Sequence, residues 1–309
     1  MASSPLAKVR SGLTRDLGVT ITPQPRWIIL AWIVCCAILL WLTRGELNAL
    51  GFRDPDDAMR LQQVRDWIGG QPFLDVSQHR VNPPAGGPMH WSRIVDMPIA
   101  AMILLLRPIV GAHLAEVLAF AIVPLLLLGG LAWALHVATR RIADKATAML
   151  APVLLLLTPT ILVQFGPLRI DHHGWQILMA TIALAGAMDS RRIRGGAVAG
   201  IAMAVWLQIS SEGLPYAALF AAIFALRQWL DGKETPRFVA YAATLGGAAL
   251  PLLALFRGTV PLLQAQCDAL SSAYVWPLLA FGAATPLAFR VISQASAIAV
   301  TAISRPATS

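Results

Sequence analysis

Long apolar runs recur along this chain, and they restrict its fold more than any other feature. The first covers residues 27–43, and others follow up to the C-terminal region. A helix needs about 20 apolar residues to cross roughly 30 Å of bilayer hydrocarbon. Of the 309 residues, 57% are apolar and 13% are charged, against about 45–50% and about 25% in soluble domains. A water-soluble globule is therefore excluded.

These runs predict an all-α fold, a polytopic transmembrane helix bundle of about 8–10 spans. After the first run, we expect spans near 98–110, 113–136, 146–165, 174–188, 195–210, 213–229 and 237–256, and one or two after residue 276. The first run is longer than the apolar core of a secretory signal and has no small-x-small cleavage site before Glu46, so we interpret it as a retained anchor. The expected domains are a segment 1–26 and a membrane domain 27–309, whose first polar loop covers 44–96.

The basic residues predict the topology of the bundle. The net charge is +8, but the cations form no stripe with interleaved aromatics of the kind that binds nucleic acid. They gather before the first run and in alternate loops: Lys8, Arg10, Arg15 and Arg26; Arg140, Arg141 and Lys145; Arg191, Arg192 and Arg194; Arg227, Lys233 and Arg237. By the positive-inside rule the N-terminus is cytoplasmic, and we expect the membrane to be a bacterial inner membrane or an archaeal plasma membrane. The loops around 44–96, 169–173 and 210–213 then share the outer face.

The first polar loop contains the pattern Phe52-Arg-Asp-Pro-Asp-Asp-Ala-Met-Arg60. One interpretation is a helix start, with Asp54 as N-cap, Pro55 in the first turn, and Asp56 and Asp57 beside the positive end of the helix dipole. An apolar stripe of Leu61, Val64 and Ile68, opposed by Gln62, Arg65 and Asp66, predicts an amphipathic helix on the outer leaflet that ends at Gly69-Gly70. Three carboxylates exceed what one cap needs, and hard cations bind such oxygens.

A second outer loop contains Arg169-Ile-Asp-His-His173 between two apolar runs. Ionisable side chains at a membrane boundary are costly to bury and by default indicate function. Asp171 and His173 offer an oxygen and an imidazole nitrogen to one divalent metal, Mn²⁺, Mg²⁺ or Zn²⁺. The alternative is a solvated helix start with Asp171 as its cap.

Two weaker patterns lie on the same predicted face. A Pro/Gly-rich loop at 82–93 holds His90 and Arg93 near the bilayer surface. His90 is either a further metal ligand or a solvated histidine. The segment 208–215 places Glu212 at a helix junction, where the alternative is a helix cap.

Together and in this order, these motifs resemble those of the catalytic subunit of oligosaccharyltransferase and its relatives in the GT-C superfamily of polyprenol-dependent glycosyltransferases. Asp54-Pro-Asp-Asp-Ala-Met-Arg60 is similar to the D-P-x-F-x-x-R element, with Asp54 and Arg60 matching. Met89-His90-Trp91 resembles the H-W of archaeal members. Asp171-His172-His173 is similar to the D-x-H or D-H-H element, and Ser211-Glu212-Gly213 resembles W-E-G with Ser for Trp.

The resemblance implies a donor site assembled around a metal. Asp54, Asp171 and His173 would be the ligands, with His90 a fourth, and Asp54 and Asp171 would be the catalytic pair. A metal neutralises the anionic oxygens left when a sugar-phosphate bond breaks. Nearby Arg93 or Arg169 is suited to bidentate contact with the donor phosphate. Asp56, Asp57, Arg60, His172 and Glu212 complete the matched motif positions.

The expected function is a membrane glycosyltransferase that moves a sugar or oligosaccharide from a polyprenyl-(pyro)phosphate donor to an acceptor on the non-cytoplasmic face. The resemblance covers residues 27–230, and the soluble domain with the family's W-W-D-Y-G motif is not found, so the acceptor stays unknown. The alternative is a membrane scaffold or transporter. A transporter carries ionisable or broken-helix features near the bilayer midplane, whereas here the polar residues gather at one surface.

Overall fold

The computed structural model describes residues 24–303, with side chains up to residue 291. Nearly all of the predicted segment 1–26 lies outside this range. The helices are α2 Arg26–Leu47, α3 Pro55–Ile68, α4 Arg93–Val110, α5 Ala112–Thr139, α6 Lys145–Leu156, α7 Pro159–Leu162, α8 His173–Ala187, α9 Arg192–Ile209, η1 Ser211–Gly213, α10 Leu214–Leu230, η2 Gly232–Glu234, α11 Thr235–Arg257, η3 Val260–Leu262 and α12 Ser272–Ile303. The described part of the chain contains no strand beyond one isolated bridge between Gln78 and Gly87. The predicted all-α class is confirmed.

Five of the described helical segments are long and apolar enough to cross a membrane: 26–47, 112–139, 211–230, 232–257 and 272–291. The chain is therefore an integral membrane protein with a polytopic helical bundle, as predicted, while the count of about 8–10 spans stays a prediction. The expected span 146–165 is broken, because α6 ends at Leu156. Thr158 is extended before Pro159, since a residue that precedes proline is disfavoured in the helical region.

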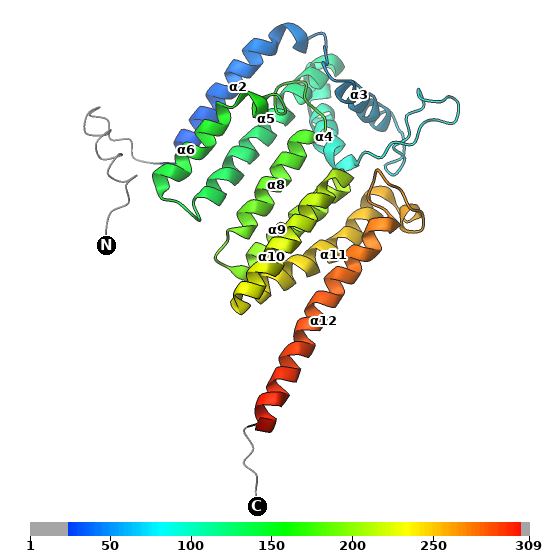
Figure 1. Ribbon diagram of the computed structural model, residues 1–309. Helices are drawn as coiled ribbons and strands as arrows, with labels where there is room; N and C mark the ends of the chain where they lie inside the picture. Colours follow the sequence, from blue (N-terminus) through cyan, green and yellow to red (C-terminus); the bar gives the residue numbers. More distant parts are fainter. Residues whose placement is uncertain (1–23, 304–309) are drawn as a thin grey trace, which may run out of the picture.

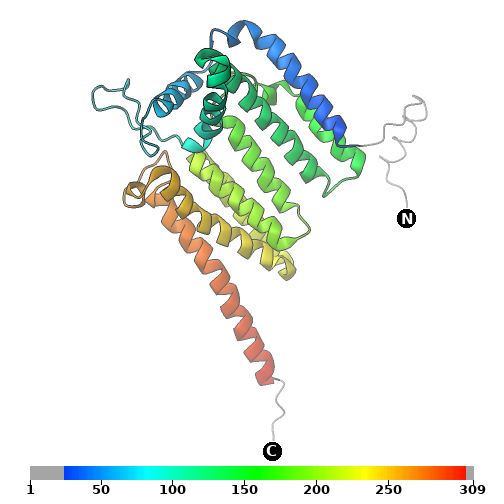
Figure 2. The same ribbon diagram turned by 180° about the vertical axis from the view of Figure 1, so that it is seen from behind.

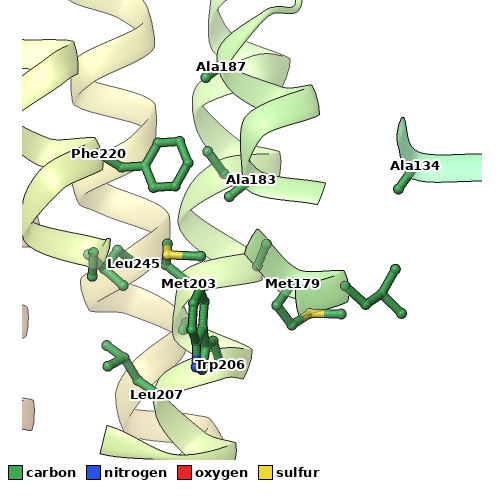
Figure 3. Close-up of a cluster of buried hydrophobic side chains, with 14 of the residues drawn as sticks. Ala134, Met179, Ala183, Ala187, Met203, Trp206, Leu207, Phe220 and Leu245 are labelled. Atoms are coloured by element: carbon green, nitrogen blue, oxygen red, sulfur yellow. The ribbon is translucent and has the colours of Figure 1, made fainter. Parts of the chain in front are cut away.

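The long helices stand side by side in a row that the chain follows (Figures 1 and 2). α2 contacts α5, α5 contacts α8, and the row continues through α9 and α11 to α12. Between α8 and α11 the core is built from Met179, Met203, Leu207, Phe220 and Leu245 (Figure 3). Small residues bring α9 close to α11, because a Cβ at Gly196 would overlap the carbonyl oxygen of Arg237. Small residues have this function in many membrane bundles.

A second core fixes the segment around α3 on one end of the bundle (Figure 1). Leu61 and Val64 of α3 pack with Ile99 of α4, Phe120 of α5 and Leu168. The backbone N–H of Leu168 also donates to the carbonyl oxygen of Phe120 at 2.9 Å. The loop between α7 and α8 is thereby held against α5 and α3.

The start of α3 is as predicted, since the Asp54 carboxylate accepts from the backbone N–H of Asp56 at 3.0 Å and Pro55 is the first helical residue. The helix ends at Ile68, and Gly70 has φ +115°, which favours glycine. The predicted two-sided pattern is incomplete, because the buried face also contains Asp57, Arg60 and Gln63. This face of α3 contacts polar groups of other segments, and the spacing of residues within α3 cannot predict these contacts. Its place on the outer leaflet stays a prediction.

Candidate functional site

Asp57 joins the motif at residues 52–60 to the motif at residues 169–173. Its side chain is fully buried, and one oxygen accepts from the backbone N–H groups of Ile170 and Asp171, each at 2.8 Å. The other oxygen accepts from Arg169 at 2.7 Å. Burial raises the pKa of Asp57 to about 6, so the carboxylate is mostly ionised at pH 7. One side chain of α3 therefore fixes the backbone of the second motif.

Arg169 lies between two carboxylates of the first motif. Its Nη1 donates to Asp54 at 2.8 Å as well as to Asp57, and its Nη2 donates to Gln164 at 3.1 Å. The hydrogen bond from Arg169 is the main reason why the pKa of Asp54 lies below its ordinary value. The Nε of Arg169 is buried and has no hydrogen-bond partner among the described residues. The guanidinium is thus held in place by three hydrogen bonds.

Asp171 contacts two histidines, one through each of its carboxylate oxygens. Nδ1 of His172 contacts one oxygen, and Nδ1 of His173 lies 2.5 Å from the other. Although burial opposes ionisation, these contacts keep the pKa of Asp171 well below its ordinary value. Asp171 does not cap α8, whose N-cap position is His172 with no side-chain cap. The alternative of a simple helix cap is therefore wrong.

Three side chains in the described part of the chain lie close enough together to bind one metal ion: Asp171, His172 and His173. One ligand atom from each lies within 4.8 Å of the others, and the two imidazole rings stack with centroids 4.6 Å apart. One carboxylate and two imidazoles suit Zn²⁺ or Mn²⁺. The donor set therefore fits a divalent metal. His172 belongs to it, whereas Asp54 is bound to Arg169.

A buried charge network supports this centre from α3 and α4. Asp96 accepts from Arg60 at 2.8 Å, from Gln63 at 2.7 Å and from Arg93 at 3.1 Å. Arg60 also lies 3.8 Å from Asp171 and stacks over Trp91 at 4.6 Å. The sequence interpretation did not include Asp96. The sequence feature that could have indicated Asp96 is its position, three residues after Arg93 and in the first turn of a predicted apolar helix.

Arg93 is placed differently from what we expected. All five of its N–H groups are used inside the protein, because beyond Asp96 they donate to the side chain of Gln71 and to the carbonyl oxygens of Gln63, Phe73 and Asp75. Its side chain is fully buried. Arg93 therefore has no donor free for a phosphate, and it acts instead as a support for Asp96.

The other predicted residues lie around the Asp-His-His group. His90 is exposed, its ring lies 6.1 Å from that of Trp91, and its carbonyl oxygen accepts from Arg257 at 2.6 Å. Glu212 is exposed and accepts from Gln176 at 2.6 Å, while Ser210 caps η1. Asp56 is partly exposed in the first turn of α3. None of these three has a ligand atom in the Asp-His-His group.

An apolar groove opens beside the site. It has a volume of about 550 Å³, and its polar end contains Asp54, Asp57 and Arg169. Its walls come from α2 and from the segment 159–168, and include Leu39, Leu42, Leu162 and Val163. A charged group and an apolar chain attached to it can therefore be held by one continuous surface.

Comparisons with known proteins bear on the fold. The sequence matches no protein-family model and no curated protein. Its structure is similar to three structures of the oligosaccharyltransferase AglB from the archaeon Archaeoglobus fulgidus: a complex with zinc and sulfate (TM-score 0.63, 15% identity), an apo form (0.64, 14%) and a complex with an inhibitory peptide and a dolichol-phosphate (0.64, 14%). The similarity covers 89%, 89% and 91% of this chain but 37%, 34% and 35% of those chains. The chain therefore has the fold of an archaeal oligosaccharyltransferase over about a third of that enzyme's length.

Proposed function

We propose that this protein is a membrane glycosyltransferase that takes a sugar or oligosaccharide from a polyprenyl-phosphate or polyprenyl-pyrophosphate donor, with the help of a divalent metal. One observation carries the proposal. The Asp171-His172-His173 group, Arg169 and an apolar groove lined by Arg169 lie together at one end of a membrane bundle. The oligosaccharyltransferase fold supports it, and so does the AglB complex with a dolichol-phosphate.

Some of the site residues would bind the metal, and others hold these residues in position. Asp171, His172 and His173 would hold the metal, which neutralises charge on the phosphate leaving group when it is bound. Asp57 keeps the backbone of this segment in place through its three hydrogen bonds.

Arg169, which lines the groove, would contact the donor phosphate with its guanidinium, while Asp54 in the same lining would orient the acceptor or take its proton. Both side chains line the same groove.

The groove fits the lipid part of the donor. An isoprenoid chain is apolar and flexible, and the side chains of α2 and of the segment 159–168 offer it an apolar wall that ends at Arg169. Burial of apolar chain surface contributes about 25 cal/mol per Å². The groove would thus contribute affinity for the lipid chain of the donor, and the charged residues at its end would orient the donor phosphate.

We place the site on the non-cytoplasmic face of a bacterial inner membrane. The loops rich in arginine, between α8 and α9 and between α10 and α11, lie at the end opposite α3 (Figure 1). This arrangement supports the proposal, because cytoplasmic loops carry an excess of Lys and Arg. The titratable groups of the site also gather at one end of the bundle, which favours surface chemistry over transport through the membrane.

Binding of decaprenyl phosphate tests the proposal without knowledge of the sugar, because a polyprenyl phosphate is the part shared by such donors. The purified protein in lipid nanodiscs is titrated with decaprenyl phosphate in Mn²⁺ or in EDTA. We expect Mn²⁺ to strengthen binding at least about tenfold and Arg169→Gln to weaken it by a similar factor. Asp56→Asn, in the same turn as the site carboxylates, is the matched control and should bind as wild type does.

Two results would count against the proposal. One is the absence of binding to the folded wild-type protein in Mn²⁺. The other is equal binding in Mn²⁺, in EDTA and by Arg169→Gln, which would favour a lipid-binding scaffold without donor recognition.

A further inference from the structure

The end of the bundle opposite the candidate site carries a dense group of cations. α8 runs from the site to this end and is about 22 Å long, at 1.5 Å for each of its 15 residues. The α8–α9 turn and the α10–α11 turn lie at this end (Figure 2), and the group belongs to these turns and to the α5–α6 loop. It consists of Arg141, Arg191, Arg192, Arg194, Arg227, Lys233 and Arg237.

Two buried carboxylates and the end of α8 organise the arginines. Asp189 pairs with Arg141 at 2.8 Å and with Arg194 at 3.0 Å. Glu234 pairs with Arg192 and Arg237, each at 2.7 Å, and with Arg227 at 3.0 Å.

Three of these arginines also donate to backbone carbonyls at the end of α8. Arg227 donates to Ala187 at 2.8 Å, Arg237 to Gly186 at 3.1 Å, and Arg141 to Ala185. Helix C-termini favour such cations. Helix packing therefore explains Arg141, Arg227 and Arg237.

The other four cations are not explained by packing. Arg191 and Lys233 are exposed, and neither side chain forms an ion pair or hydrogen bond among the described residues. Arg192 and Arg194 are each held through Nε alone, so their terminal nitrogens stay free of protein acceptors in this region.

These four cations share one cavity. It has a volume of about 570 Å³ and is lined by Arg191, Arg192, Arg194, Lys233, Ile193 and Pro236, with no carboxylate in the lining. Guanidinium groups fixed on one side are well suited to bidentate contact with phosphate oxygens. The cavity is therefore built for an anion.

The side chains around the cavity indicate which kind of molecule carries the anion. Ile193 is 67% exposed, and at the same end of the bundle Trp229 is 80% and Leu230 73% exposed. Exposed tryptophan and aliphatic side chains beside cations are typical of the level where lipid headgroups meet the hydrocarbon. We propose that Arg191, Arg192, Arg194 and Lys233 form a binding site for the phosphate of an anionic phospholipid. This site is separate from the proposed donor site.

Phosphatidylglycerol binding in neutral detergent tests this proposal. Native mass spectrometry gives the affinities of the full chain for phosphatidylglycerol and for phosphatidylcholine. The double variant Arg191→Gln/Lys233→Gln removes two unpaired cations, and Arg53→Gln/Arg80→Gln removes two cations that are 76% and 64% exposed at the other end. We expect the first variant to bind phosphatidylglycerol at least about fivefold more weakly and the second to change by less than about twofold.

Folding and ligand source are checked in the same series. Because neither the Arg191 nor the Lys233 side chain forms an ion pair or hydrogen bond in the described region, the melting temperature of the first variant should lie close to that of wild type, and Lys233→Gln alone should weaken binding by an intermediate factor. Soluble glycerol 1-phosphate at the same concentration should not compete. Wild-type affinity in the first variant, equal losses in both double variants, or full competition by glycerol 1-phosphate would each overturn the proposal.

Discussion

Asp57 provides the sharpest test of how the site is built, through the variant Asp57→Ala. The carboxylate accepts one charged hydrogen bond from Arg169 and two from the backbone N–H groups of Ile170 and Asp171. All three bonds end on an ionised carboxylate, and a hydrogen bond to a charged group contributes about 1.5–3 kcal/mol, while the desolvation of the buried carboxylate offsets part of their sum. The loop before α8 should therefore lose about 3–5 kcal/mol of local stability.

Hydrogen exchange measured on peptides that cover residues 168–173 reports this loss directly. A loss of 3 kcal/mol corresponds to exchange about 100-fold faster for the amides of Ile170 and Asp171. Asp57→Asn keeps an acceptor for both amides but not the charge that holds Arg169, so it should cause a smaller change. Asp56→Ala, one position earlier in the same turn, should leave exchange near the wild-type rate. Unchanged exchange in Asp57→Ala, or an equal increase in Asp56→Ala, would refute the reasoning.

Two further predictions concern stability. Asp96→Ala leaves the guanidinium groups of Arg60 and Arg93 buried without their carboxylate, and such a loss costs about 3–5 kcal/mol; a melting temperature in detergent equal to that of wild type would contradict it. Gly246→Ala places a Cβ where it overlaps the carbonyl oxygen of Leu278, whereas the neighbouring Gly247 has open space. We expect Gly246→Ala to destabilise by about 1–3 kcal/mol and Gly247→Ala to be neutral or slightly stabilising, so equal melting temperatures would show that α11 and α12 do not pack this closely.

Most of the fold could be predicted from local signals. Apolar runs predict helices because a backbone in hydrocarbon must satisfy its own hydrogen bonds. The start of α3 was readable because its cap and proline are neighbours in sequence. The sequence Thr158-Pro159 also indicates the break after Leu156, but a prediction from hydropathy alone does not detect this break.

The candidate site was only partly predictable. The order of the motifs placed Asp54 and Asp171 on one face, and the structure brings the segments around them together through Asp57 and Arg169. The burial of Arg93 against Asp96 depends on which face of α3 meets α4. The spacing of Arg93 and Asp96 is local, but the contacts from α3 that bury the pair join residues 30 to 36 positions apart, and no local spacing encodes those contacts.

The metal centre is the central claim, and Mn²⁺ binding followed by electron paramagnetic resonance tests it most directly. The wild-type protein in detergent should bind one Mn²⁺ with nitrogen couplings from imidazole ligands. Asp171→Asn and the pair His172→Ala/His173→Ala should lose that site, whereas Glu212→Gln, exposed on a neighbouring element, should keep it. A folded wild-type protein that binds no Mn²⁺, or an Asp171→Asn variant that binds it with unchanged affinity and couplings, would contradict the account.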